Sequence, residues 1–181
     1  MKAQFLAAAG ALALAACGSG ADDAATDATT AEYAAAADAA TVAMDAQTFA
    51  DTAAASDMYE IEAGKLAQEM GSSDAVKDFG GMMVEAHTKS SADLKSAAAE
   101  ADGVTVDPQL TAKHQSDLDA LRNAGEMFDA IYKTQQVAAH EAALALLTDY
   151  GTNGDSEPLK AFATNTRPVV EEHLMHAREL P

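Results

Sequence analysis

Apolar residues recur at helical spacing through almost all of residues 47–180, and this periodicity constrains the fold more than any other feature. No stretch alternates strictly between apolar and polar side chains, as a half-buried strand would. Alanine is abundant and aromatic residues make up only 5% of the chain, which also disfavours strands. The sequence therefore predicts an all-α domain.

Capping residues and glycines divide this region into helices. Ser72 or Ser73 is suited to cap one helix, and Asp107-Pro108 to begin another. Gly151 is expected to end a helix, and Pro168 to kink the last one. The expected helices cover about residues 47–70, 73–102, 108–122, 126–150 and 157–180.

The lengths of the links between these helices predict the topology. Tight links join the first two helices and the last two, so each pair should form an antiparallel hairpin. The middle link contains the short helix and is long enough to cross the whole bundle. We therefore expect a ferritin-like four-helix bundle with a short extra helix between helices 2 and 3. A simple up-down-up-down bundle is the alternative.

The first residues resemble a secretory signal. Lys2 is followed by an apolar run from Phe5 to Ala16, which is too short to span a bilayer. Small residues before Cys17, the only cysteine, resemble the lipobox of bacterial lipoproteins, in which the thiol is lipidated. An ordinary signal peptide is the alternative. We expect a signal peptide at 1–16, a lipidated Cys17 with a flexible tether at 17–46, and a bundle domain at 47–181.

The tether and the net charge limit the partners. Residues 17–46 are rich in Ala, Asp and Thr and contain no Lys or Arg, so they have little to bury. Gly18 after the cysteine, by resemblance to lipoproteins, favours the periplasm with anchoring to the outer membrane. The formal charge of −18 and the lack of a basic cluster exclude nucleic acid as a natural partner and leave cations as plausible ones. The sequence does not indicate a protein partner.

Polar side chains interrupt the apolar stripes of all four long helices. Asp129, Tyr132, Gln136 and His140 share one narrow stripe of a single helix, at about 100° per residue. In each of the other long helices one ionisable residue lies in phase with the apolar residues. These residues are Glu60, His87 and His173.

Heights along the bundle predict two neighbouring groups. At a rise of about 1.5 Å per residue, Glu60, His87 and His140 lie near the middle of their helices. Asp129 lies far from His140 on the same helix, and an antiparallel arrangement brings His173 toward it. The expected groups are Glu60–His87–His140 and Asp129–His173, with Tyr132 and Gln136 between them.

Buried polar groups of this kind must satisfy one another, hold a cation or line a wet cavity. Histidines and carboxylates are ligands for a divalent metal, and nearby methionines are soft ligands for Cu(I). The Glu-x-x-His pattern of di-iron bundles is absent, because Val84 and Val170 stand three residues before His87 and His173. Glu85 is a candidate to assist His87. His114 and His176 are expected at the surface, and the methionines in question are Met82, Met83, Met127 and Met175.

Four segments resemble, in order, those of a ferritin-like bacterial family known as domain of unknown function 4142. They are MYEIEAGKLA (58–67), VKDFGGMMVEAHTKSSADLK (76–95), FDAIYKTQQVAAHEAAL (128–144) and RPVVEEHLMHA (167–177). The resemblance implies an exported, often lipid-anchored protein. Members often carry an acid where this chain has Ala86. The family pattern extends to Glu60, His87, Asp129, Tyr132, His140, Pro168 and His173.

Two functions remain open at this point. The protein binds a metal cation or a small polar ligand through its inward Glu, His and Asp residues, or it is a structural or interaction protein whose inward network sets helix register. No phosphate loop, nucleophile elbow or catalytic cysteine is present, so no catalytic residue is assigned and enzymatic activity is not indicated.

Overall fold

A computed structural model describes residues 44–181. The chain divides into two units, Met1–Ala40 and Thr41–Pro181, and all the described helices belong to the second. The predicted signal peptide, Cys17 and nearly all of the tether lie outside the described residues. Within the described part, no helix is both long enough and apolar enough to cross a bilayer.

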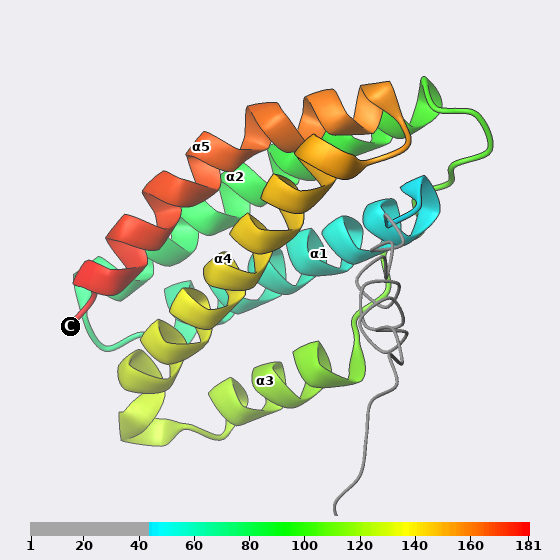
Figure 1. Cartoon of the computed structure of the whole chain (residues 1–181). Coiled ribbons are helices and arrows are strands. Elements are labelled where there is room, and N and C mark those ends of the chain that lie inside the picture. Colours follow the sequence, from blue (N-terminus) through cyan, green and yellow to red (C-terminus); the bar gives the residue numbers. More distant parts are fainter. Residues whose placement is uncertain (1–43) are drawn as a thin grey trace, which may run out of the picture. The chain divides into compact units, whose positions relative to one another are not determined.

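The described part of the chain is a four-helix bundle with one short additional helix, as predicted (Figure 1). The long helices form two pairs, and the short helix α3 lies in the connection between the pairs. The bounds are α1 Ala46–Met70, α2 Asp74–Ala99, α3 Ala112–Arg122, the 3-10 turn η1 Gly125–Met127, α4 Phe128–Asn153 and α5 Glu157–Glu179.

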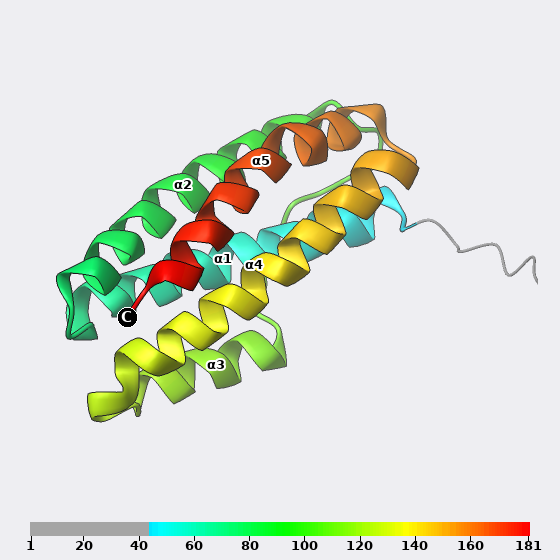
Figure 2. The ribbon, with the colours of Figure 1, turned by 60° about the vertical axis from the view of Figure 1, so that its left-hand side comes forward.

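The connection between α2 and α4 crosses the length of the bundle. At one end, the side chain of Gln47 at the start of α1 donates to the carbonyl of Thr105 beyond α2, at 2.8 Å. At the other end, Asp129 at the start of α4 accepts from the amide of Ser72 in the α1–α2 turn, at 2.8 Å. The chain therefore returns along α3 before α4 begins, and α2 and α4 run parallel (Figures 1 and 2).

Several helix ends differ from the prediction. Thr111, rather than Asp107-Pro108, caps α3, because its hydroxyl accepts from the amide of His114. The helix α4 continues through Gly151 and ends at Asn153, with Gly154 as its C-cap. A β-carbon at Gly151 would lie 3.2 Å from the Thr164 hydroxyl of α5, so this glycine permits close packing rather than ending the helix. Pro168 lies inside α5, which continues on both sides of it, and the kink expected there stays a prediction.

Two glycines bring α1 and α2 close together. A β-carbon at Gly64 would lie 2.6 Å from the carbonyl oxygen of Gly80, and one at Gly80 would lie 2.7 Å from that of Gly64. Real side chains do not occupy such positions. The two backbones therefore touch at this height, which fixes the register of the first hairpin.

The core consists of two apolar clusters separated by a polar layer. One cluster gathers around Tyr59, Phe79 and Tyr132, and the other around Phe49 and Phe162. On each long helix, at least one buried polar residue falls between the segments that contribute to the two clusters, and Glu60 directly follows Tyr59 of the first cluster. These residues, called the polar layer below, are Asp57, Glu60, His87, Gln136, His140 and His173.

Candidate metal centre

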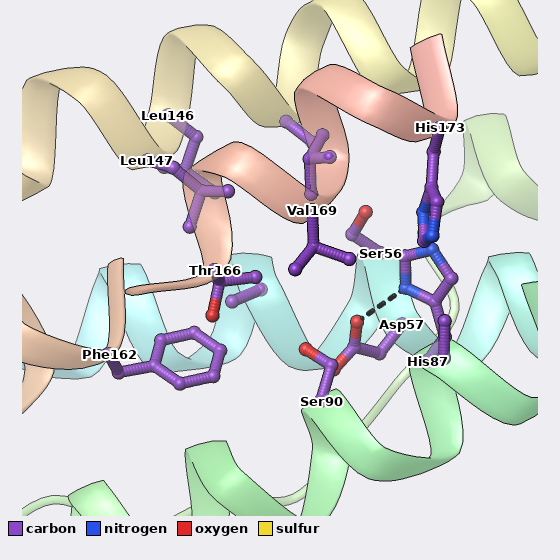
Figure 3. Close-up of a pocket in the computed structure, with 14 residues that line it drawn as sticks. Ser56, Asp57, His87, Ser90, Leu146, Leu147, Phe162, Thr166, Val169 and His173 are labelled. Atoms are coloured by element: carbon purple, nitrogen blue, oxygen red, sulfur yellow. Dashed lines mark hydrogen bonds and ion pairs between the residues drawn. The ribbon is translucent and has the colours of Figure 1, made fainter. Parts of the chain in front are cut away.

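Three histidines from three helices meet in the polar layer. His87 of α2, His140 of α4 and His173 of α5 are all buried, and each offers a nitrogen within 4.8 Å of those of the other two. Their ring centroids are 5.9, 5.8 and 5.6 Å apart, which is nearly an equilateral triangle. We call these residues the histidine triad. Figure 3 shows the rings of His87 and His173 facing each other.

His87 is held by a carboxylate of α1. Its Nδ1–H donates to Oδ1 of Asp57 at 2.8 Å (dashed in Figure 3), and the hydroxyl of Ser91 lies 3.3 Å from Oδ2. Burial by itself lowers the pKa of His87, but the Asp57 hydrogen bond and the charges of Glu60 and Asp57 outweigh it and raise the pKa. Because Nδ1 carries the hydrogen in this bond, the lone pair of the neutral ring is on Nε2. This nitrogen is buried and has no hydrogen-bond partner.

His140 is oriented by the backbone of its own helix. Its Nδ1–H donates to the carbonyl oxygen of Gln136 at 2.8 Å, and Oε1 of Glu60 lies 3.9 Å from the same nitrogen. Burial lowers the pKa of His140 in spite of the Glu60 charge. The ring is therefore neutral, with the lone pair on Nε2, which is also buried and without a partner.

His173 completes the triad from α5. Burial, together with the neighbouring rings of His87 and His140, lowers the pKa of His173 to about 3, so its ring is neutral near pH 7. Its Nδ1 is buried and has no hydrogen-bond partner. All three buried histidines thus have a ring nitrogen without a hydrogen-bond partner, and together they form a group that could hold a metal ion.

Glu60 places a negative charge beside the triad. It is 1% exposed, and its Oε2 has no hydrogen-bond partner. The hydroxyl of Tyr132 and the side-chain amide of Gln136 are also buried without partners. A buried carboxylate in such surroundings is costly unless a cation lies nearby.

The predicted grouping of site residues was partly wrong. Glu60, His87 and His140 do come together, but His173 joins them instead of pairing with Asp129. Both carboxylate oxygens of Asp129 accept backbone amides, from Ser72 at 2.8 Å and Ser73 at 2.9 Å. Heights counted from helix midpoints misplaced His173, because packing between helices, and not helix length, sets their relative register.

Other predicted residues lie away from the triad. Glu85 is exposed, since two residues along a helix turn it about 200° away from His87. His114 is half-buried, and its ring stacks on that of Tyr59 with the centroids 4.9 Å apart. Met127 and Met175 are 60% and 57% exposed, and Met82 and Met83 belong to the Tyr59 cluster. The methionines therefore give no support to a soft Cu(I) site.

Asp57 is the important residue that the sequence analysis missed. It is buried and holds His87, and it precedes Glu60 by three residues. That spacing places both carboxylates on one face of α1. The pattern Asp57-x-x-Glu60 could therefore have been used to predict that Asp57 faces inward with Glu60.

With the geometry established, comparison with known proteins identifies the family. Residues 30–180 match the family model described as "Domain of unknown function (DUF4142)". The chain belongs to the DUF4142 family. No curated protein and no solved structure matches the chain. The function of this DUF4142 protein must therefore be argued from its own residues.

Proposed function

We propose that this DUF4142 protein binds one divalent transition-metal ion through the histidine triad. The observation that carries the proposal is the convergence of three buried histidines from three different helices, each with one ring nitrogen within 4.8 Å of those of the other two. Each of the three rings also has a buried nitrogen without a hydrogen-bond partner. Neutral imidazole is a preferred ligand of Zn(II), Cu(II), Fe(II) and Ni(II). Charge complementarity supports the same conclusion, because Asp57 and Glu60 supply two buried carboxylates beside the site.

The ligand geometry suits an ion with an open coordination position. A tetrahedral Zn(II) at about 2.1 Å from each nitrogen requires nitrogens about 3.4 Å apart. The present separations of up to 4.8 Å would shrink by small side-chain rotations. Three protein ligands are the usual number in zinc sites that retain a fourth position for water or another molecule.

Asp57 and the Gln136 carbonyl would hold the ligands in place. Metal-bound histidines commonly donate their other ring N–H to a carboxylate or a backbone carbonyl, which fixes the tautomer and strengthens the ligand. His87 has the first kind of partner and His140 the second. Both arrangements leave Nε2 available, which supports metal binding by these two rings.

The alternative, a network that only sets helix register, has less support. A buried polar network stabilises a fold when its members satisfy one another. In the described residues, every buried side-chain nitrogen or oxygen without a partner, except Nδ1 of His114, belongs to the polar layer or to the adjacent Tyr132. A bound cation would remove much of this deficit.

We also propose that the protein is a ferritin-like envelope protein. It is exported to the periplasm and anchored to the outer membrane through a lipidated Cys17. The apolar run that ends in Leu14-Ala15-Ala16-Cys17 supports this proposal. Labelling with a fatty-acid analogue tests it. The wild type should be labelled and Cys17→Ser should not, and equal labelling of the two would refute the anchor.

Metal analysis tests the proposed binding. The full chain, purified in detergent without a histidine tag, would be loaded in turn with Zn(II), Fe(II), Mn(II) and Cu(I). We expect about one ion per chain and a raised Tm. The double variant His87→Ala/His140→Ala should bind none. The matched control, His114→Ala/His176→Ala, removes two histidines outside the triad and should bind normally. Equal metal content in both double variants would refute the site.

A further inference from the structure

A small pocket adjoins the histidine triad. It has a volume of ≈ 40 Å³, and His87, His173 and Asp57 form one end of it (Figure 3). His140 is not among the residues that line it. Free space therefore meets the triad on the side of His87 and His173.

The walls of this pocket are mainly apolar. Leu147, Phe162 and Val170 line it, together with Ala53 and Ala143. Three hydroxyl residues also line it, namely Ser56, Ser90 and Thr166. Asp57 is the one charged residue among those that line the pocket in the described chain, and its Oδ1 already accepts from His87. Such walls admit small molecules of low charge and penalise larger ions.

A wider groove adjoins the pocket and shares part of its lining. The groove lies between α2 and α5, has a volume of ≈ 470 Å³, and is lined on its outer side by charged residues such as Lys89 and Asp93. The inner pocket and the groove have five lining residues in common, which form the neck between them. The neck residues are Ala86, Ser90, Phe162, Thr166 and Val169.

The neck explains an unusual feature of α5. Val169 is 44% exposed although its side chain is apolar. Its side chain lines both the groove and the inner pocket, next to Thr166 (Figure 3). An apolar side chain at this point keeps the passage from the groove to the triad poorly hydrated.

We propose that the inner pocket is the binding space of a small exogenous ligand, of two or three non-hydrogen atoms, that reaches the metal through the neck and takes its open position. The inference rests on the proposed metal site. The size limit follows from the volume, since ≈ 40 Å³ holds about three water-sized molecules at roughly 10–15 Å³ each. Diatomic gases and triatomic anions such as azide belong to this class.

Azide binding to the Co(II)-loaded full chain tests this proposal. Cobalt reports a change in its coordination through its visible absorption, and imidazole serves as a larger probe. The variant Ala86→Leu narrows the neck from α2, and Val169→Phe narrows it from α5. Ala92→Leu places the same substitution at an exposed position of α2 and is the matched control. Metal content is measured separately in every protein.

We expect azide, but not imidazole, to change the wild-type spectrum. With cobalt content unchanged, each neck variant should bind azide about tenfold more weakly or more slowly, and Ala92→Leu should match the wild type. If cobalt content is full but azide causes no spectral change, the ligand pocket is overturned and the metal site stands. The same holds if both neck variants respond to azide as the wild type does. Failure of the wild type to bind cobalt or any other metal tested would overturn both proposals. If one neck variant fails to fold, the other is used for the comparison, because the two substitutions lie on different helices.

Discussion

Asp57 and His87 form a buried hydrogen-bonded pair between α1 and α2, with Oδ1 and Nδ1 2.8 Å apart. The pair orients the ring so that Nε2 points away from Asp57 and is left without a partner. One helical turn later on α1, Glu60 lies 3.9 Å from Nδ1 of His140. A single face of α1 therefore supplies a carboxylate behind each of two triad histidines, although α1 contributes no histidine itself.

The first prediction concerns Asp57. Replacing it with Asn keeps an acceptor for His87 but removes the charge that strengthens the ring as a ligand. We expect the affinity for Zn(II) to fall about 10-fold to 100-fold while the stoichiometry stays the same. Competition with a chromophoric chelator measures this. The exposed Asp51→Asn on the same helix is the control, and equal affinities for the two variants would contradict the positioning role.

Glu60→Gln should have opposite effects with and without metal. In the metal-free protein, the substitution removes a buried charge with an unpartnered oxygen and should raise the free energy of unfolding by about 1 kcal/mol. In the loaded protein, it removes a negative charge near the cation and should weaken binding. Denaturant unfolding of both forms measures the two effects. Glu62→Gln changes a partly exposed carboxylate paired with Lys65, and should shift stability by less than about 0.5 kcal/mol. The same sign of change in both forms of Glu60→Gln would count against a cation at this place.

Asp129→Ala should reduce stability without affecting metal. Burial is the largest single influence and raises the pKa of Asp129, but the amides of Ser72 and Ser73, the Ser73 side chain and the charge of Lys77 together outweigh it and lower the pKa. A lowered folded-state pKa means that the stabilisation is complete above the unfolded value of about 3.9 and is lost as the pH falls through the folded value. We expect a loss of about 1 kcal/mol at pH 7 that shrinks toward pH 3.

Unfolding curves at several pH values, with metal content measured in parallel, check this prediction. Unchanged stability at pH 7 would refute the capping role of Asp129. Loss of bound metal would restore the original idea that Asp129 belongs to the metal site.

The glycine contact between α1 and α2 can be tested with neighbouring residues. Gly80→Ala places a methyl group 2.7 Å from the carbonyl of Gly64, so the helices must separate, at a cost of about 1–3 kcal/mol. Gly81→Ala meets only the end of the flexible Gln68 side chain, at 2.9 Å, and should be neutral or gain up to about 1 kcal/mol from helix propensity. Thermal unfolding compares the Tm values of the two variants. Similar Tm values for the two variants would show that the hairpin register does not depend on this contact.

Much of the fold could be predicted because it rests on local physics. Helical periodicity and caps such as Ser73 depend on residues close in sequence, and the link lengths limit the possible connections. Gly151 shows where local reasoning fails, because its role is to let α5 approach α4. A glycine that ends a helix and one that permits close packing look alike in the sequence.

The sequence by itself determined which residues face inward. Glu60, His87, His140 and His173 are buried as their helical phase predicted, because side-chain direction repeats every 3.6 residues or so along a helix. Phase is a property of one helix and needs no knowledge of its neighbours. The same reasoning, extended to Asp57, would have predicted the other carboxylate of α1.

Only the tertiary structure decided which of these residues meet. The height of His173 relative to His87 and His140 depends on how α5 slides against α2 and α4, and that register is set by the interlocking of side chains across the interfaces. A shift of one turn moves a residue by about 5.4 Å, which is more than the separation of the triad nitrogens. For this reason the inward-facing histidines could be predicted from the sequence. The packing of the helices determined that the three histidines meet and that Asp129 binds the amides of the α1–α2 turn instead.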